Sequence, residues 1–257
     1  MHIQENSSKM TTNTMSENSL LRQARVFLSD DDYMNLHWPK LESAILLILQ
    51  QSPGQFIPIS YEEMYSTVYK CVCQQYADRM YSNLTELVAT YLRGVSMELQ
   101  VTPKEAYLEK FHFVMEQFFQ AVSGIVAIFS YMNRFYVTTK LQTDLKTELG
   151  KLFTNLVADN DFLFTVIEEV SSKPFGADPQ VMMSIVKGLY SLKPEFSSRN
   201  PVLFARFIPN VLPPTQCEQL PSLIQEDRML QEDLVTSQGF SRDDTGKKRR
   251  GDDFHGR

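Results

Sequence analysis

The 257-residue chain is 43% hydrophobic and 22% charged, the composition of an ordinary globular protein with one elongated or two compact domains. Its net charge of −6 and pI near 5.3 argue against a nucleic-acid partner, which would require a concentrated basic face. Residues 1–19 have no apolar signal-peptide core, and the longest uncharged stretch, 117–133, falls short of the roughly 20 apolar residues that a bilayer requires, so we expect no membrane segment.

The first predicted helix begins at Ser29. This serine can cap the helix, and the three aspartates after it favour the positive end of the helix dipole. Apolar residues then keep helical spacing to about Gln51. Pro39 lies too far inside for a first-turn position, so the helix is either split or begins nearer His37. The polar, weakly patterned residues 1–28 are expected to be disordered.

Three further helices follow the first. The pattern Ser60-x-x-Glu63 is a capping box, and the helix after it places apolar residues at i, i+3, i+4 and i+7. The same periodicity predicts a third helix over 77–99. Pro103 opens a fourth helix at a first-turn position. Gly124 marks either a break in that helix or a close helix–helix contact.

The second half of the chain is also predicted to be helical. A fifth helix starts at Ile125 and continues without interruption to Val157, because leucine and phenylalanine residues keep to one face. Shorter helices are predicted over 162–170, 181–192 and 201–212, with an amphipathic helix over 215–237 and a flexible charged tail over 238–257. The sequence therefore predicts an all-α fold, a bundle of long packed helices with disordered termini.

Three segments of this pattern resemble the amino-terminal repeat of the cullin family. Residues 61–84, YEEMYSTVYKCVCQQYADRMYSNL, are similar to the second and third helices of that repeat. Trp38 in HWPKLESAI is similar to the Trp-x-x-Leu entry of its first helix, and SYMNRFYV (130–137) is similar to its fifth-helix signature. The resemblance extends over about 38–212. It implies a cullin-repeat-like domain over 29–214, with one repeat and the start of a second.

The resemblance also implies a protein-docking surface. In cullins, the second and fifth helices of the first repeat together bind a Skp-like or BTB-fold adaptor. Tyrosine, methionine and arginine, which occur in both segments of this chain, are enriched in the cores of protein interfaces. Carried over by position, the partner-binding residues are Tyr61, Met64, Tyr65, Val68, Asn133, Arg134, Tyr136 and Val137.

Helical spacing alone also fits aromatic residues that simply fill the core of the bundle. We expect a division between the two roles. The residues expected at the surface are Tyr61, Arg134 and Tyr136, and those expected in the core are Tyr65, Tyr69 and Phe135.

Other stretches, among them IVKGLYSLKPE, FIPNVLPP and KKRRGDD, are similar to a small branch of the cullin family that associates with a cyclin-dependent kinase. This resemblance implies kinase binding, promotion of kinase activity and support of G1/S progression and proliferation, with ubiquitin-ligase binding. The alternative is a truncated scaffold, too short for a RING-binding domain, that occupies adaptors and modulates ubiquitin-dependent degradation. Two loose basic-x-Leu cyclin-docking patterns, at Lys187 and Arg228, are short enough to arise by chance.

We expect no enzyme activity, cofactor or metal site. The chain has no glycine-rich phosphate loop, and His112 beside Glu109 and Glu116 is ordinary helix-surface chemistry. Cys71 and Cys73 point in different directions on a helix and have no nearby histidine to complete a zinc site. Three cysteines in all are too few for a disulfide framework and fit a reducing compartment.

The tail carries the one basic cluster of the sequence, Lys247, Lys248, Arg249 and Arg250. The cluster is either a nuclear-import signal or a solubilising patch balanced by neighbouring aspartates. With the reducing compartment, the first interpretation predicts a nuclear and cytoplasmic location.

Overall fold

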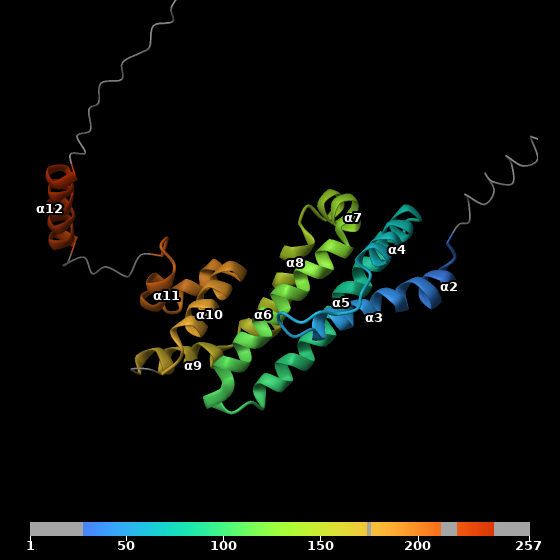
Figure 1. The fold of residues 1–257 in the computed structure, drawn as a ribbon, viewed down its shortest axis with the longest axis horizontal. Helices are drawn as coiled ribbons and strands as arrows, with labels where there is room; N and C mark the ends of the chain where they lie inside the picture. The colour runs from blue at the N-terminus through green and yellow to red at the C-terminus, as the bar shows by residue number, and fades with distance from the viewer. Residues whose placement is uncertain (1–27, 174–175, 212–219, 239–257) are drawn as a thin grey trace, which may run out of the picture.

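The computed structural model describes residues 28–173, 176–211 and 220–238. Over these residues the regular structure is helical throughout, which confirms the all-α prediction (Figure 1). The elements in chain order are α2 (Asp30–Asp32), η1 (Tyr33–His37), α3 (Trp38–Gln50), α4 (Tyr61–Cys73), α5 (Ala77–Gln100), α6 (Lys104–Ile128), α7 (Ser130–Met132), η2 (Asn133–Leu141), α8 (Leu145–Phe153), η3 (Thr154–Ala158), α9 (Asp161–Ser172), α10 (Pro179–Leu192), η4 (Pro194–Ser198), α11 (Pro201–Phe207) and α12 (Leu220–Gln238).

The first helix begins at Ser29, as predicted. The Ser29 hydroxyl accepts a hydrogen bond from the Asp32 amide at 3.0 Å, and the Asp32 carboxylate accepts from the Ser29 amide at 3.4 Å, which completes a capping box. The chain then stays helical to Gln50, but it passes through a wider π turn, η1, directly before Trp38. This turn lets Pro39 occupy the first turn of α3, where its missing N–H leaves no helical bond unmade.

The next two helices also begin where the sequence predicts. The Ser60 hydroxyl accepts a hydrogen bond from the Glu63 amide at 3.3 Å, so half of the predicted capping box forms. The Glu63 carboxylate pairs instead with Lys40 of α3, which links the first two helices. Gln75 adopts a left-handed backbone with φ 70°, and this turn separates α4 from α5.

The long helix α6 passes through Gly124 without a break. A Cβ at this position would lie 2.9 Å from the Tyr61 hydroxyl and 3.3 Å from Cγ2 of Ile48. The glycine is therefore a close-contact site against α3 and α4, which was one of its two predicted roles. By length and composition α6 could span a membrane, but half of its most apolar window is buried against other helices, as in the core helix of a bundle.

The prediction of a continuous fifth helix to Val157 is wrong. The segment α7–η2 ends at Leu141, where Gln142 adopts a left-handed backbone with φ 54°. Asp144 then caps a new helix, α8, by accepting a hydrogen bond from the Thr147 amide at 3.0 Å. The chain therefore folds back, and α8 packs against α5 and α6.

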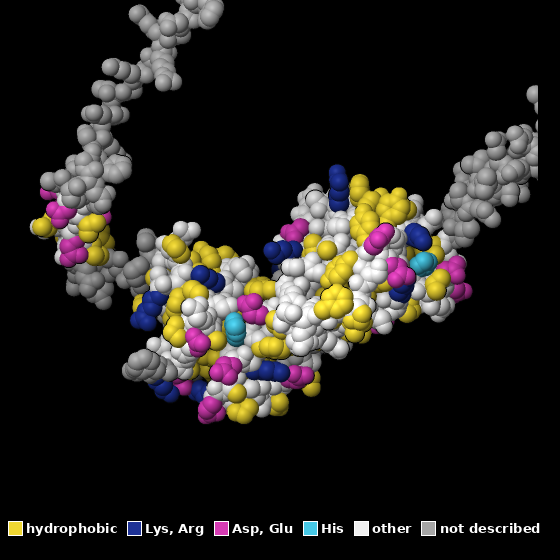
Figure 2. Space-filling model, in the orientation of Figure 1, with side chains coloured by type: hydrophobic (Ala, Val, Ile, Leu, Met, Phe, Trp, Pro, Cys, Tyr) yellow, Lys and Arg dark blue, Asp and Glu magenta, His cyan; other side chains and the backbone are white. Residues whose placement is uncertain are grey.

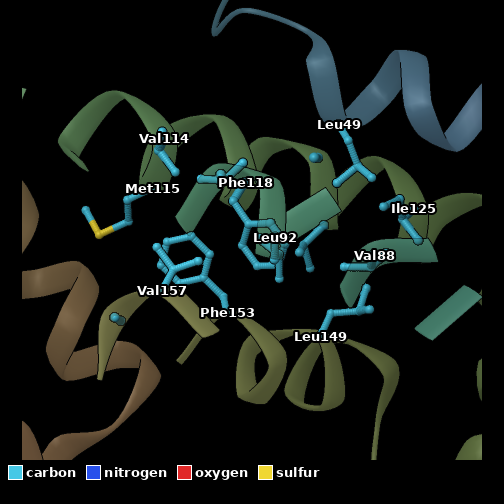
Figure 3. Packing of buried hydrophobic residues seen from close by; sticks show 14 of the residues in the cluster. Leu49, Val88, Leu92, Val114, Met115, Phe118, Ile125, Leu149, Phe153 and Val157 are labelled. Atoms are coloured by element: carbon cyan, nitrogen blue, oxygen red, sulfur yellow. The ribbon is translucent and has the colours of Figure 1, made fainter. Parts of the chain in front are cut away.

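The buried side chains of the described residues form one core that runs from η1 and α3 to α11. Figure 3 shows part of this core, where Phe118 of α6 and Phe153 of α8 stack with ring centroids 4.7 Å apart. Further along, α10 packs on α6 so closely that a Cβ on Gly188 would lie 2.5 Å from the sulfur of Met115. The short helices α9 to α11 thus extend the same core. On α12, the described side chains are all exposed.

Candidate protein-docking surface

An exposed aromatic face covers the neighbouring helices α4 and α7–η2. The rings of Tyr69 and Tyr131 meet edge to face with centroids 4.7 Å apart, and Tyr131 contacts Phe135 at 4.5 Å. The Arg134 guanidinium lies 5.4 Å from the centroid of Phe135. Because residues four apart share one side of a helix, Tyr61 and Tyr65 continue the stripe of Tyr69 along α4. We define the aromatic face as Tyr61, Tyr65, Tyr69, Tyr131, Arg134 and Phe135.

Most side chains of the aromatic face are exposed to solvent. The side chains of Tyr65, Tyr69 and Phe135 are 38%, 45% and 49% exposed, and Tyr61 is 41% exposed. Figure 2 shows hydrophobic side chains gathered over the end of the molecule where Figure 1 places α4 and α7. The prediction that Tyr65, Tyr69 and Phe135 lie in the core is therefore wrong, whereas Tyr61 and Arg134 are exposed as predicted.

The physical reason is that each helix carries two adjacent apolar stripes. On α4 the buried stripe contains Met64, Val68 and Cys71, and the tyrosines form the second stripe beside it. Both stripes have helical spacing, so periodicity alone cannot tell which one faces the core. Packing decides in favour of the smaller side chains, which let α4 lie close to α6.

Tyr136 was predicted at the surface, but its side chain is buried. Its hydroxyl donates a hydrogen bond to the Asp78 carboxylate of α5, and its ring lies 6.0 Å from that of Tyr81. The hydrogen bond to Asp78, assisted by burial, raises the pKa of Tyr136 to about 12. Tyr136 therefore holds η2 against α5 instead of meeting a partner directly.

The structure divides the eight residues of the predicted docking site into three groups. Tyr61, Tyr65 and Arg134 belong to the aromatic face. Asn133 is half-buried, and its side-chain oxygen accepts a hydrogen bond from the Leu145 amide at 2.8 Å, which ties η2 to the start of α8. The fully or nearly fully buried members, which support the face from below, are Met64, Val68, Tyr136 and Val137.

Three aromatic residues of this face were missing from the predicted site. Tyr69, Tyr131 and Phe135 belong to the face itself. Phe56, in the loop before α4, is 91% exposed. Its position in the turn-rich sequence QSPGQFIPIS was a usable signal, because a large apolar side chain in a loop of Pro and Gly residues has no helix to bury it.

The aromatic face carries little charge at neutral pH. Hydrogen bonding to Cys73 raises the pKa of Tyr69, and burial raises the pKa of Tyr131, with Cys73 as a second cause. The Cys73 sulfur lies 4.0 Å from the Tyr131 hydroxyl. Both phenols therefore stay neutral, and Arg134 supplies the one cation of the face as defined. Such a face suits an apolar partner surface with an acidic group at its edge.

The histidine and cysteine residues considered as possible ligands lie apart from the aromatic face or outside any metal-binding cluster. Within the described ranges, no group of three His, Cys, Asp or Glu residues is arranged to hold a metal ion. Nε2 of His112 lies 3.9 Å from the Glu116 carboxylate on the surface of α6, and that carboxylate also accepts from Ser184 of α10. Cys71 is buried, which raises the pKa of its thiol to about 11, whereas Cys73 is exposed.

The motifs suggested for cyclin docking and nuclear import lie in different settings. After Lys187, the residues Gly188 and Leu189 are buried in α10, so this pattern is not available to a partner. The second pattern follows Arg228 on α12 and is exposed. The predicted import signal, 247–250, lies outside the described residues.

Comparison with known proteins places most of the helical region in one family. A family model described as the cullin alpha solenoid domain matches residues 38–212. The chain is 42% identical over 224 residues to CDK2-associated and cullin domain-containing protein 1 of Rattus norvegicus, covering 87% of this chain and 56% of the rat protein. It thus spans about half the length of that relative.

The matches to longer cullins have lower identity and cover fewer residues. The chain is 29% identical over 121 residues to Cullin-3B of Arabidopsis thaliana and 29% identical over 115 residues to Cullin-3 of Dictyostelium discoideum. These matches cover 47% and 45% of this chain, and 16% and 15% of the two relatives. Because the cullin model covers well over half of the sequence, and all described helices between residues 38 and 211 belong to one packed bundle, the chain belongs to the cullin family.

Proposed function

We propose that this chain is a non-enzymatic regulator that binds other proteins, and that it docks an adaptor of the Skp-like or BTB-fold type on its aromatic face. The observation that carries the proposal is the exposure of four aromatic rings and one arginine, packed around the half-buried Tyr131 on two neighbouring helices. Aromatic and arginine side chains dominate the binding energy of protein interfaces. Helices tied together by buried side chains present them in a fixed arrangement.

The proposal extends to a kinase partner. The similarity over 87% of the chain to a protein named as CDK2-associated supports association with a cyclin-dependent kinase. On this proposal the chain promotes the activity of that kinase and supports G1/S progression and proliferation. The exposed pattern after Arg228 on α12 is a candidate cyclin contact that lies outside the aromatic face. The two partners can therefore use different surfaces.

A second candidate function follows from the similarity to Cullin-3 proteins. The chain would occupy ubiquitin-ligase adaptors and so modulate ubiquitin-dependent degradation of their targets. The aromatic face serves both candidates, so the readout must distinguish them. Purified chain added to a cyclin–kinase complex should raise substrate phosphorylation under the first candidate. Under the second candidate it should leave the kinase unchanged and alter the half-life of an adaptor's substrate.

The docking proposal is tested by affinity capture from cells with partners identified by mass spectrometry. We expect the double variant Tyr65→Ala/Phe135→Ala to lose the adaptor, because each truncated anchor typically weakens binding by about 1 kcal/mol or more. The kinase should still be captured. The matched control, Met97→Ala/Val202→Ala, truncates two exposed apolar side chains outside the aromatic face and should keep both partners. An unchanged set of partners in the first variant would contradict docking on the aromatic face.

Location is part of the proposal. We propose that the basic cluster 247–250 directs a nuclear pool while the remainder stays cytoplasmic. Replacing its four residues by alanine should lower the nuclear fraction of a fluorescently tagged chain. Replacing the nearby Asp252 and Asp253 by asparagine is the control and should leave that fraction unchanged. Equal nuclear fractions in the alanine variant and wild type would exclude an import role.

A further inference from the structure

An apolar groove with a basic wall lies where α6, α8 and the end of α10 meet. Its volume is about 570 Å³, and its lining includes Phe119 and Val122 of α6 and Leu192 of α10. A Cβ on Gly150 would lie 3.6 Å from Leu192, so the absence of a side chain there leaves space between α8 and α10. The groove is made by helices other than those that carry the aromatic face.

Two lysines of α8 give the groove its charge. Lys146 and Lys151 both line it, and both are exposed. Lys151 Nζ also lies 2.8 Å from the Glu148 carboxylate, and Lys146 interacts with Asp144. The ion pair of Lys151 with Glu148 leaves the exposed lysine able to meet a competing carboxylate, because a single pair near the surface contributes little. The remaining polar lining residues, Ser123, Thr147 and Ser191, are neutral.

Helix α12 presents the complementary surface. Leu220, Leu223, Ile224 and Leu230 fall on one side of the helix and are 45%, 46%, 51% and 62% exposed. Asp227 lies in the middle of that side, between Leu223 and Leu230, where its carboxylate accepts a hydrogen bond from Gln231 at 3.2 Å. Over 220–238 the segment has four acidic residues and one basic residue. An acidic helix with an apolar side matches an apolar groove with a lysine wall.

A short connection links the two surfaces. Eight residues, 212–219, join the last residue described after α11 to the start of α12, and a chain of this length spans at most about 30 Å. Helix α11 packs against α10, and the last residues of α10 line the groove. A helix attached here therefore meets the groove of its own chain at a high effective concentration.

We propose that α12 docks in this groove of its own chain, with Leu223 and Leu230 against the apolar floor and Asp227 beside Lys146 and Lys151. A lone amphipathic helix of this length is marginal in water and owes most of its stability to tertiary packing. Docking supplies that packing. It also covers Leu230 of the exposed Arg228 pattern, and it leaves the aromatic face open to an adaptor.

The experiment is hydrogen exchange of the full chain, read by mass spectrometry. We expect the amides of α12 to exchange about tenfold or more slowly than an unstructured peptide. The variant Leu223→Ser/Leu230→Ser should abolish this protection and increase exchange in the groove segment 144–151. Asp227→Lys should do the same. Gln225→Lys, which adds the same positive charge on the opposite side of α12, is the matched control and should exchange as wild type does.

Swapping the charges of the groove lysines and of Asp227 tests whether α12 binds in this groove. Lys146→Glu/Lys151→Glu alone should remove the protection of α12, and combining it with Asp227→Lys should restore it. Hydrogen exchange of α12 as fast as that of an unstructured peptide, in the wild-type chain, would overturn the proposal. Failure of the combined charge-swapped variant to restore protection would overturn it too. Protection that disappears on dilution, together with a mass of two chains in solution, would overturn docking within one chain and assign the groove to the α12 of a second copy.

Discussion

The hydrogen bond between Tyr136 and Asp78 shows how one residue of the predicted docking site acts from below the surface. The Tyr136 hydroxyl joins η2 to α5, and Lys140 Nζ lies 5.4 Å from the centroid of the Tyr136 ring. The neighbouring residues Arg134 and Phe135 are thereby held in place on the aromatic face. A substitution at Tyr136 should act on stability, whereas one at Phe135 should act on binding.

Tyr136→Phe tests this division. The variant removes the hydrogen bond from the phenol to the exposed Asp78 carboxylate, so we expect the free energy of unfolding to fall by about 1 kcal/mol in urea titrations. The exposed Tyr65→Phe is the control and should change it by less than about 0.5 kcal/mol. Equal effects of the two substitutions would contradict a special role for the bond to Asp78.

The same bond predicts a dependence on pH. The folded pKa of Tyr136 is about 12, above its usual value of 10, so the folded chain holds this proton more tightly than the unfolded chain. The stabilisation is fully present below pH 10 and is lost as pH rises through about 12. The difference in unfolding free energy between wild type and Tyr136→Phe should therefore shrink over this interval. A constant difference from pH 8 to 12 would contradict the assignment.

At the scale of helices, two glycines have opposite surroundings. On Gly188 of α10, a Cβ would lie 2.5 Å from the sulfur of the buried Met115 and 3.2 Å from Phe119, whereas a Cβ on Gly94 of α5 would meet nothing within 4 Å. Both glycines lie inside helices, where alanine is intrinsically the better residue. The space around each glycine therefore decides the sign of a substitution.

Gly188→Ala should destabilise the protein by about 1–3 kcal/mol, because either the buried Met115 side chain or α10 itself must shift to make room for the new Cβ. Gly94→Ala, its matched control, should stabilise it by about 0.5–1 kcal/mol. Combining Gly188→Ala with Met115→Ala should restore room, so the double variant should be less destabilised than the sum of the single variants. Thermal unfolding followed by circular dichroism measures all four. Additive effects would show that α10 does not pack on Met115 as described.

The helix boundaries that the sequence predicted well are those with a local chemical signal. Ser29 and Ser60 can accept hydrogen bonds from the first turn, and Pro103 fits the start of α6. The failure at Gln142 has a physical reason, because a left-handed backbone at a residue other than glycine depends on surroundings that local sequence does not reveal. The two helices of the docking site were found, but which apolar stripe faces solvent is decided by tertiary packing.

At the scale of the whole molecule, the described core is continuous from Tyr33 near the first helix to Ile208 after α11. Helices α9 and α10 pack on α6, and α11 packs on α10, so the start of the second repeat shares the core of the first. The single domain over 29–214 remains a prediction that rests on this continuity. It implies that distant parts of the chain unfold together.

Trp38, the one tryptophan of the sequence, reports on α3 because its side chain is buried there. Leu189 is fully buried in α10, in the second repeat. Leu189→Ala should lower the free energy of unfolding by about 2–5 kcal/mol. If the core is one cooperative unit, the denaturation midpoint of Trp38 fluorescence should shift as far as that of helical circular dichroism. The exposed Met97→Ala, as control, should shift neither. The contrary result is an unchanged midpoint of Trp38 fluorescence together with a circular dichroism signal that unfolds in two steps. It would show that the first repeat and the start of the second unfold independently.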